Sequence, residues 1–528
     1  MQQNNTNWFT PISYALMIIV GIVIGVFVKG DLSMRGLFTA KQDPILEMIQ
    51  IVQSKYVDSL KNDSASIKLA DYYLSQLDPH SVYIPPADLV DVNEQLAANL
   101  KGIGIEFQQF RDSFFVTYVL KDGPAFKGGV QLGDILLKAN DSIKLSGGNL
   151  QADEVRQKVK GPEDSPLKLV VLRKSKQVQL QLTRANIPIS PMDAYYMISD
   201  TVGYIKLNKF TDRTYEAFMQ ALDPLVQKGM KSLVLDLRNN GGGLLSEAVA
   251  IADELLPGNK LIVYTEGVNS PKKEYKAKRS GLFETGKLVV LMNEGSASAS
   301  EVIAGALQDH ERATIVGRRS FGKGLVQEQY TLSDGSALRL TIARYFTPLG
   351  RSIQKPYDEG NEAYDMEVMS RFHQGDAKQI DSTKYQRKPV KTASGKTLYG
   401  GGGISPDLTV AIDPIMFDTG YNRIYINNII GNFSYRYFMA NKNNILSYKN
   451  VATYSSQYSP DDKVLVQLVD FAQKQDVKFL LSSPASKNRA KNTIKAMVAR
   501  LAWNESAYFH VLNQQDETFI RAMEAISK

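Results

Sequence analysis

The hydrophobic pattern begins with one continuous apolar run near the start of the chain. Residues Ile12–Val28, ISYALMIIVGIVIGVFV, carry no charge over 17 positions. At about 1.5 Å per residue, a helix of this length is at the lower limit for crossing a bilayer core of roughly 30 Å. A cleavable signal peptide is the alternative, but no basic residue precedes the run and Val28-Lys29-Gly30 is a poor cleavage site. The pattern therefore favours an uncleaved membrane anchor.

The pattern after this run changes twice along the chain. Residues 42–87 carry apolar positions at helical spacing, and from Leu89 to about Thr183 short strand patterns are broken by glycine. Buried strands and amphipathic helices then alternate, as in VGYIKLNKF, DRTYEAFMQALDPLVQK and SLVLDLRNNGGG, which predicts an α/β core. The last part of the chain, as in SPDDKVLVQLVDFAQKQ, returns to helical spacing.

Length and composition set the number of folded units and exclude some chemistry. A chain of 528 residues is too long for one core and should hold about three or four units. The net charge of +7 is modest and the basic residues are spread along the chain, so we expect no nucleic-acid partner. Cysteine is absent, which excludes disulfides and thiolate metal sites. Four histidines without an HExxH motif give a zinc protease no support.

The stretch NEGSASASEVIAGALQDHERATIVGRRSFGKGLVQEQ holds the candidate chemistry. Residues 317–323 fit a GxxxxGK phosphate loop, but Gly324 stands where Ser or Thr should bind Mg²⁺ and a strand pattern follows, so we reject a nucleotide site. In a Ser-His-Asp triad the base would be His310, which lies roughly 18 Å from Ser298 along a helix. A serine–lysine dyad requires a lysine whose pKa is lowered by burial. On local spacing alone, serines that cap a helix and a solvated Lys323 are the better choice.

In the dyad interpretation, Ser298 follows a buried strand at the start of a helix. The N–H of Ala299 and the helix dipole then face a developing oxyanion. Lys323 lies between two glycines, which allow its backbone to pack tightly. Along a strand, Lys323 and Gln327 point to one face, so Gln327 can orient the amine without adding a charge.

Residues 89–183 resemble a PDZ domain. The resemblance rests on Gly102-Ile103-Gly104-Ile105 and on the GPAFKGGVQLGD turn and short helix, whereas GxG alone would suggest an ordinary β-turn. It implies that the backbone N–H groups of Ile103, Gly104 and Ile105 hold a peptide C-terminal carboxylate, and that the peptide adds as an extra strand. Glycine suits this loop because the backbone must approach the ligand closely.

The segment EGSASASEVIAGALQDHERATIVGRRSFGKGLVQ resembles the active-site segment of the carboxy-terminal processing (tail-specific) peptidases, serine peptidases that carry a PDZ domain. LDPHSVY, VGYIKLNKF, LDLRNNGGG, ARYFTPLGRSIQ and GGGISPDL match the family in its order, over roughly residues 45–410. The resemblance implies that Ser298 is the nucleophile, Lys323 the general base and Gln327 its supporting residue.

The same resemblance implies that the oxyanion donors are the N–H groups of Ala299 and Gly242. Gly241 stands where the family often has proline, which loosens the turn that carries Gly242. Gly129 replaces the alanine that is usual in the PDZ helix, a minor change.

The implied fold class is α/β multidomain, with a ClpP/crotonase-like α/β serine-protease core, an inserted PDZ domain and flanking helical segments. The implied function is a membrane-anchored serine endopeptidase that cleaves proteins near their exposed, apolar C-termini without a metal or other cofactor. A catalytically inactive PDZ adaptor at the membrane is the alternative. A homo-oligomer is a further partner to test, and Gly21 and Gly25 form a GxxxG pair compatible with helix pairing.

Six segments make up the expected organisation. They are an N-terminal tail (1–11), a transmembrane anchor or signal segment (12–28), an N-terminal helical region (29–88), the PDZ domain (89–183), the serine–lysine peptidase domain (184–412) and a mainly helical C-terminal domain (413–528).

The charge pattern and the resemblance disagree about the side of the membrane. Lys29, Arg35 and Lys41 follow the apolar run and no basic residue precedes it, which would keep the C-terminal part in the cytoplasm. The family resemblance implies an envelope enzyme. Because only these three residues create the bias, we expect a single-pass inner-membrane protein with residues 30–528 in the periplasm.

Overall fold

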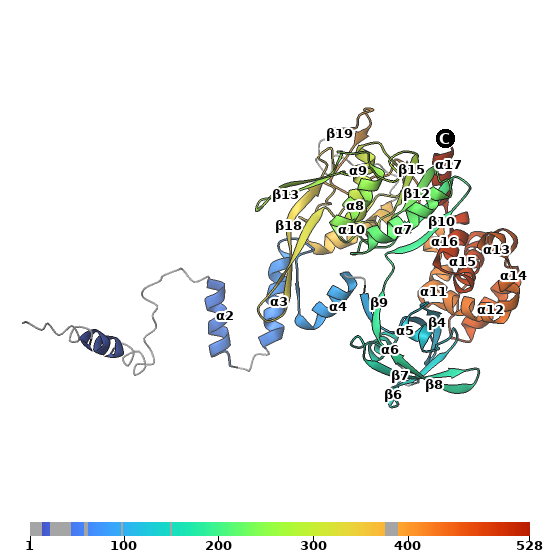
Figure 1. Cartoon of the computed structure of the whole chain (residues 1–528), viewed down its shortest axis with the longest axis horizontal. Coiled ribbons are helices and arrows are strands. Elements are labelled where there is room, and N and C mark those ends of the chain that lie inside the picture. The colour runs from blue at the N-terminus through green and yellow to red at the C-terminus, as the bar shows by residue number, and fades with distance from the viewer. Residues whose placement is uncertain (1–12, 22–43, 58–61, 97–98, 148–149, 375–388) are drawn as a thin grey trace, which may run out of the picture. The chain divides into compact units, whose positions relative to one another are not determined.

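The computed structural model describes residues 13–21, 44–57, 62–96, 99–147, 150–374 and 389–528 (Figure 1). The chain divides into two compact units, Met1–Ala70 and Asp71–Lys528. The first unit contains the helix at 13–21, α2 (Pro44–Lys55) and the start of α3 (Asn62–Ser75). The candidate site lies in the second unit, which is described by itself below.

The apolar run lies only in part within the described residues. Residues 13–21 are helical, whereas Ile12 and residues 22–28 lie outside the described residues. In the described part of the chain, no helix has both the length and the apolar character that a membrane span requires. This finding contradicts the expected single-pass inner-membrane anchor and, with it, the placement of residues 30–528 in the periplasm.

The PDZ region is a small antiparallel sheet in the order β3-β4-β5-β7-β8, with β6 on β5. Alternation directs Phe114 and Val116 of β4 into its core, together with Leu136, Leu169 and Val171. The hairpin that the sequence predicts at its end is formed by β7 and β8. The elements are β2 (Asn99–Gly102), β3 (Ile105–Phe110), β4 (Ser113–Val119), α5 (Pro124–Lys127), β5 (Ile135–Ala139), β6 (Ile143–Lys144), α6 (Ala152–Val159), β7 (Pro166–Arg173), β8 (Lys176–Thr183) and β9 (Ala185–Pro188), which pairs with β2.

The α/β core is a six-stranded sheet in the order β10-β11-β12-β15-β16-β21, parallel except for β10. Because β12 and β15 are parallel neighbours, the loops that leave their carboxyl ends meet at one edge of the sheet, where α/β proteins form their sites. The strands are β10 (Met192–Met197), β11 (Val202–Leu207), β12 (Ser232–Asp236), β15 (Lys287–Met292), β16 (Thr314–Gly317) and β21 (Leu408–Thr409), and the helices are α7 (Thr214–Gln227), α8 (Leu245–Leu255) and α9 (Ala299–Asp309).

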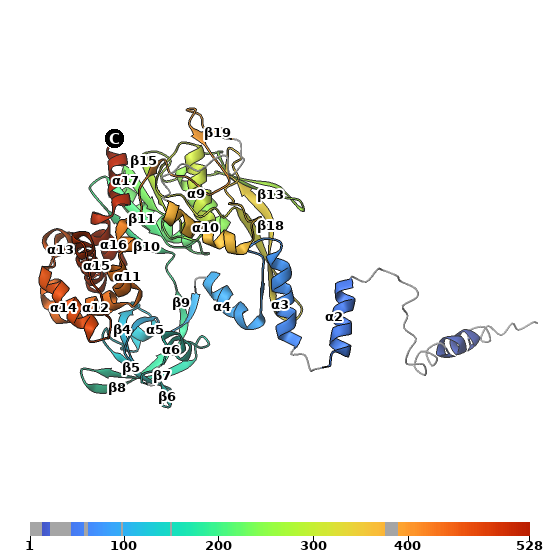
Figure 2. The ribbon, with the colours of Figure 1, turned by 180° about the vertical axis from the view of Figure 1, so that it is seen from behind.

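Helices cover both faces of this sheet, as a parallel sheet requires (Figures 1 and 2). Leu235 and Val290 point into a cluster with α7, α8 and α9. Val234 and Leu291 point to the opposite face and pack with Phe519 of α17 (Glu517–Ser527). Because neither face of the sheet is in contact with water, the sequences of these strands are continuous apolar runs.

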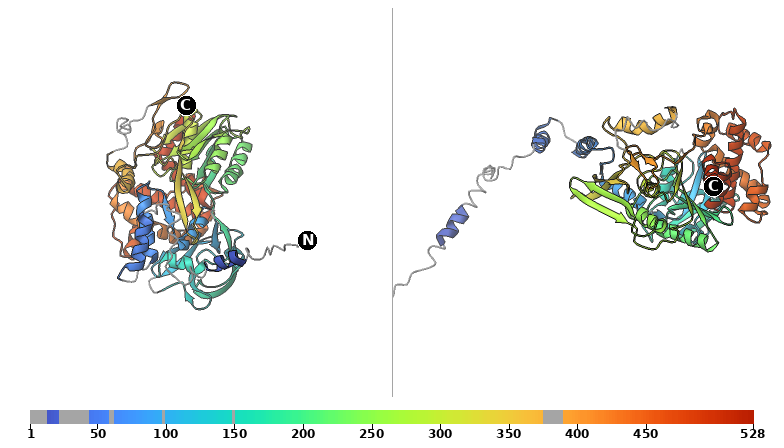
Figure 3. Two further views of the ribbon diagram at one scale, coloured as in Figure 1. Left: turned by 90° about the vertical axis from the view of Figure 1, so that its left-hand side faces the viewer. Right: turned by 90° about the horizontal axis from the view of Figure 1, so that it is seen from above.

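A second sheet supplies the lysine side of the site. Its order is β1-β18-β13-β14, and β17 pairs with β18 in a long antiparallel ribbon, yellow in Figure 3. The elements are β1 (Val82–Ile84), β13 (Leu261–Gly267), β14 (Ser270–Lys276), β17 (Leu325–Thr331) and β18 (Ala337–Phe346). Around these sheets lie α4 (Pro86–Leu96), α10 (Asn361–Gln374), β19 (Val390–Lys391) and β20 (Thr397–Leu398).

The last part of the chain is helical and contacts the α/β sheet and the PDZ sheet (Figures 1 and 2). The rings of Phe110 in β3 and Phe471 in α14 stack with centroids 5.6 Å apart. The elements are η1 (Pro414–Phe417), α11 (Thr419–Ile426), α12 (Ile429–Leu446), α13 (Val451–Gln457), α14 (Asp462–Gln473), α15 (Pro484–Ala502), α16 (Glu505–Leu512), η2 (Asn513–Gln515) and α17 (Glu517–Ser527).

A buried ion-pair network fastens α17 to the core. Arg238, just after β12, donates to Asp236 at 2.6 and 3.0 Å and to both carboxylate oxygens of Asp516 at 2.8 and 2.9 Å. Asp516 in turn accepts from the N–H of Phe519 and caps α17. Burial opposes the charge on Asp236, but Arg238 and Lys206 hold the pKa of its carboxyl below the usual range.

We predict that Arg238→Ala lowers the free energy of unfolding by about 3–5 kcal/mol, because it leaves the buried Asp236 carboxylate without its main partner. Urea denaturation of the full chain measures this loss. Arg521→Ala, which breaks an exposed pair with Glu524, is the control and should cost about 1 kcal/mol or less. Equal losses in the two variants would contradict the prediction.

Candidate active site

Ser298 is held in a strained turn between β15 and α9. It is the N-cap of α9, with φ 55° and ψ −115°, a region that side chains other than glycine rarely occupy. Such backbone strain costs about 1–3 kcal/mol and persists only where neighbours enforce it. Here Ala297 donates its N–H to the carbonyl of Asn240 at 3.0 Å, and Ser300 Oγ donates to the same carbonyl at 2.9 Å.

The three serines of the motif differ in exposure and in partners. Ser296 and Ser300 are fully buried, and their hydroxyls donate to backbone carbonyls, that of Ser296 to Leu237 at 2.8 Å. Ser298 is half-buried. The two flanking serines therefore fasten the turn, and the middle one faces the site.

The structure brings Lys323 and Gln327 together. Lys323 Nζ donates to Gln327 Oε1 at 3.2 Å, and Gln327 Nε2 donates to the carbonyl of His80 at 2.6 Å. Burial, and then the Arg339 guanidinium, lower the pKa of the Lys323 amine. Gln327 is thereby fixed by a backbone group of the LDPHSVY segment, a link that sequence reasoning missed.

Tyr345 is the residue at which the serine and lysine segments meet. Its buried hydroxyl donates to the carbonyl of Lys323, and the Ser298 side chain lies next to it. Among the contacts of the described residues, no direct hydrogen bond joins Ser298 Oγ to Lys323 Nζ. Catalytic hydrogen bonds are often long without substrate and tighten when it binds. The ARYFTPLG motif, which carries Tyr345, was the sequence signal for this residue.

Glu301 connects the two segments through one carboxylate. It is fully buried and accepts from the N–H of Ser298 at 2.8 Å, from the N–H groups of Gly322 and Lys323 at 2.8 and 2.9 Å, and from Ser320 Oγ at 2.5 Å. Burial raises the pKa of Glu301 to about 7, although these four donors act in the opposite direction. An acidic residue three positions after the serine, inside an apolar helix, was the signal that sequence reasoning did not use.

Gly242 lies directly against the turn that holds Ser298. A Cβ added to it would lie 2.7 Å from Ser298 Cβ and 3.0 Å from the nitrogen of Ala299, and its φ of +95° also favours glycine. The Gly242 N–H donates to Asn240 Oδ1 at 2.9 Å, so an oxyanion would have to replace that acceptor. Ala299 provides the first N–H of α9, where helix N–H groups lack intrahelical partners.

The two histidines of the core have other surroundings. His310 lies at the far end of α9 and its Nε2 contacts the carbonyl of Leu261 at 2.7 Å, which excludes it as a base for Ser298 in this fold. His80 Nε2 lies 2.9 Å from the Tyr364 hydroxyl. Burial, and then the charge of Lys323, lower the pKa of His80 to about 4.

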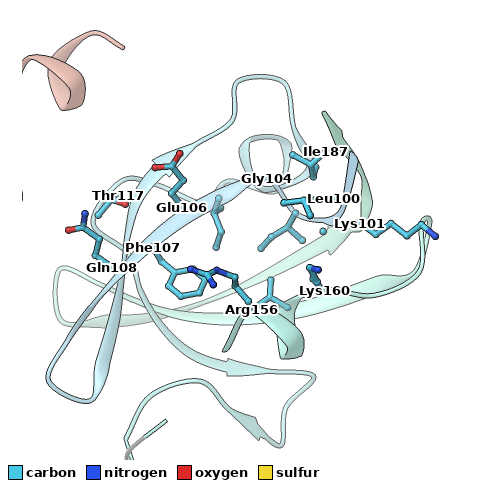
Figure 4. A pocket seen from close by; sticks show the side chains of 14 residues that line it. Leu100, Lys101, Gly104, Glu106, Phe107, Gln108, Thr117, Arg156, Lys160 and Ile187 are labelled. Atoms are coloured by element: carbon cyan, nitrogen blue, oxygen red, sulfur yellow. The ribbon is translucent and has the colours of Figure 1, made fainter. Parts of the chain in front are cut away.

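A groove of about 430 Å³ runs along the open edge of the PDZ sheet (Figure 4). Strand β3 lies at the edge of this sheet. It pairs with β4 on one side, and no other strand of the sheet pairs with its other side. Ile103, Gly104 and Ile105 line the groove, and Arg156 and Lys160 add positive charge. Figure 4 shows Glu106, Gln108 and Thr117 at one end of the groove and Leu100, Lys101 and Ile187 at the other.

Comparison with known proteins gives three family matches. Peptidase family S41 matches residues 201–362, the PDZ domain matches residues 115–173, and a family of unknown function (DUF8443) matches residues 420–504. The first of these covers the Ser298 and Lys323 segments, and the third covers most of the C-terminal helices.

Two curated sequences and one solved structure represent the relatives. The carboxy-terminal-processing protease of Bartonella bacilliformis is 35% identical over 315 residues, which cover 58% of this chain and 71% of the relative. A probable CtpA-like serine protease of Staphylococcus aureus is 33% identical over 344 residues, or 63% of this chain and 67% of the relative. The photosystem II D1 C-terminal processing protease is 27% identical, covers 70% of this chain and 87% of its own, and has a TM-score of 0.38.

We predict that Glu301 makes the stability of the protein depend on pH between its usual pKa of 4.5 and about 7. Because the pKa is raised in the folded state, the folded protein holds the extra proton, and stability falls as the pH rises through this window. Glu301→Gln should remove this contribution, so the wild type should lose stability relative to the variant as the pH rises. Urea midpoints of both proteins across the window measure the effect, and a constant difference would contradict it.

Proposed function

Since the chain belongs to peptidase family S41 and is a carboxy-terminal-processing serine protease, we propose that it cleaves proteins near their C-termini through a Ser298–Lys323 dyad. The observation that carries this proposal is the Tyr345 hydroxyl, which contacts both the Ser298 side chain and the Lys323 backbone. The strained backbone of Ser298 and the lowered pKa of Lys323 support the same assignment. No step of the proposed reaction uses a metal or other cofactor.

In the proposed reaction, the neutral Lys323 amine takes the proton of Ser298 Oγ as that oxygen attacks the scissile carbonyl. The tetrahedral oxyanion is stabilised by the Ala299 N–H, and by the Gly242 N–H once this group turns from Asn240 Oδ1 to the oxyanion. Collapse breaks the C–N bond, and Lys323 returns the proton to the leaving amine. Water then attacks the acyl-enzyme with Lys323 as base, which releases the acid and regenerates Ser298. Gln327 keeps the amine in position.

For the PDZ domain we propose the role of substrate receptor. The N–H groups of Ile103, Gly104 and Ile105 would hold the C-terminal carboxylate, and the substrate tail would pair with the free edge of β3. The apolar lining supports a preference for apolar tails. Assembly into a homo-oligomer stays a prediction.

We predict that Ser298→Ala and Lys323→Ala each reduce kcat/KM for peptide hydrolysis by at least about a thousandfold, because each removes a reacting group. Gln327→Ala should cost about ten- to a hundredfold, because it orients the amine without reacting. His310→Ala is the control and should leave kcat/KM unchanged. Loss of activity in His310→Ala with activity kept in Lys323→Ala would exclude the dyad. Failure of a serine-reactive probe to label Ser298 would instead favour the inactive PDZ adaptor.

We also predict that amidation of a peptide's C-terminus lowers kcat/KM about tenfold or more, since charge-assisted hydrogen bonds to the Ile103–Ile105 amides are lost. Matched free-acid and amidated peptides of one sequence measure the effect. Equal rates would rule out the carboxylate site.

A further inference from the structure

The edge strand of the PDZ sheet has two faces with different neighbours. Ile105 and Phe107 pack against the PDZ core and line the groove. Phe110 packs against the C-terminal helices, and Glu106 forms an ion pair with Arg500 of α15. Because side chains alternate along a strand, one face of β3 belongs to the PDZ core and the other is turned to the C-terminal helices.

A pocket of about 220 Å³ lies between this outer face and the C-terminal helices. Gln108 and Thr117 line both this pocket and the peptide groove, so the two spaces adjoin at β3. The Oε1 atom of Gln108 is buried and has no hydrogen-bond partner among the described residues. A buried acceptor without a partner costs free energy, which a ligand's donor would recover. From the helices, the pocket is lined by Gly431, Tyr435, Met497, Arg500, Leu501, Glu505 and Tyr508.

Two carboxylates flank Arg500 beside this pocket, Glu505 in its lining and Glu106 in the lining of the groove. Arg500 donates to Glu106 at 2.9 and 3.2 Å and also to Glu505. Two carboxylates thus share one guanidinium and leave a net negative charge. The side chains of Glu106 and Glu505 are 48% and 38% exposed, so both are open to a ligand. Arg156 and Lys160 line the groove but not this pocket.

A substrate tail in the groove must present alternate side chains to this pocket. Its carboxylate lies at the loop before β3, so the tail runs antiparallel to β3. Residues opposite each other in an antiparallel pair share a face. With the last residue beside Ile105, the second and fourth residues from the end lie beside Glu106 and Gln108, on the face of the C-terminal helices.

We propose that the C-terminal helices complete the substrate-tail site, and that Glu106, Glu505 and Gln108 select a hydrogen-bond donor at the second and fourth residues from the substrate's C-terminus, with a cationic side chain preferred at the second. This inference rests on the proposed role of the PDZ domain. It assigns a function to a helical region that otherwise contributes only packing.

The test uses the full chain with Ser298→Ala, so that bound peptides are not cleaved. Three fluorescent free-acid peptides differ only in Lys, Ala or Glu at the second position from the end, and their Kd values are measured by anisotropy. Burial raises the pKa of Glu505, so the measurement is made at mildly alkaline pH, where the carboxylates are charged. The Lys peptide should bind about fivefold or more tightly than the Glu peptide.

Two variants each replace one carboxylate with an amide, which removes the charge and keeps the shape of the side chain. Glu505→Gln lies on the helical side and Glu106→Gln on the PDZ side, and each should reduce the Lys-over-Glu preference at least about twofold. Glu524→Gln, on α17, is the matched control and should leave the preference unchanged.

The outcomes separate this inference from the proposed PDZ role. If a free-acid peptide binds more tightly than its amide but the three peptides bind equally, the PDZ role stands and the inference is wrong. A Lys preference that survives both Glu505→Gln and Glu106→Gln also overturns it. If amidated and free-acid peptides bind equally, the proposed PDZ role itself fails.

Discussion

The Glu301 carboxylate accepts four hydrogen bonds from donors on two separate loops, and the geometry of the candidate site depends on it. One donor is the N–H of Ser298, and two others are the N–H groups of Gly322 and Lys323. A carboxylate is an acceptor at every lone pair, so it can hold several N–H groups that point inward from different directions. Because the side chain lies inside the core, water does not compete for these donors.

The strained turn at Ser298 is kept by the same packing. Ser298 has a positive φ, and Gly242 approaches it so closely that any side chain at Gly242 would collide with the turn. Asn240 hydrogen bonds to both the Ser298 turn and the Gly242 turn. Its carbonyl accepts from Ala297 and Ser300, and its amide oxygen accepts from the Gly242 N–H. The β12 and β15 loops thus form one hydrogen-bonded body, which is how the fold sustains an unfavourable backbone conformation where a nucleophile would lie.

The C-terminal helices extend this organisation to the edge of the PDZ sheet. At one end Asp516 joins Arg238 beside β12, and at the other Arg500 joins Glu106 of β3. The first ion pair is largely buried and the second is partly exposed, and the stacked rings of Phe110 and Phe471 add an apolar contact between the helices and β3.

The sequence by itself determined the fold class, the family and the segments that carry the candidate chemistry, because glycine-rich turns, apolar strands and the SASASE and FGKG motifs are local patterns. The antiparallel hairpin of β7 and β8 also followed from local alternation. The apolar composition of residues 12–28 predicted a membrane-spanning helix, and no helix of the described residues meets the requirements for one. The resemblance already pointed to Ser298 among the three serines, but only the tertiary structure gives the physical difference, since Ser296 and Ser300 are buried with their hydroxyls bonded to backbone carbonyls and Ser298 is half-buried. The tertiary structure also decided the roles of His80, Glu301 and Tyr345, because hydrogen bonds between distant segments depend on how the two sheets pack, and no local pattern encodes that packing.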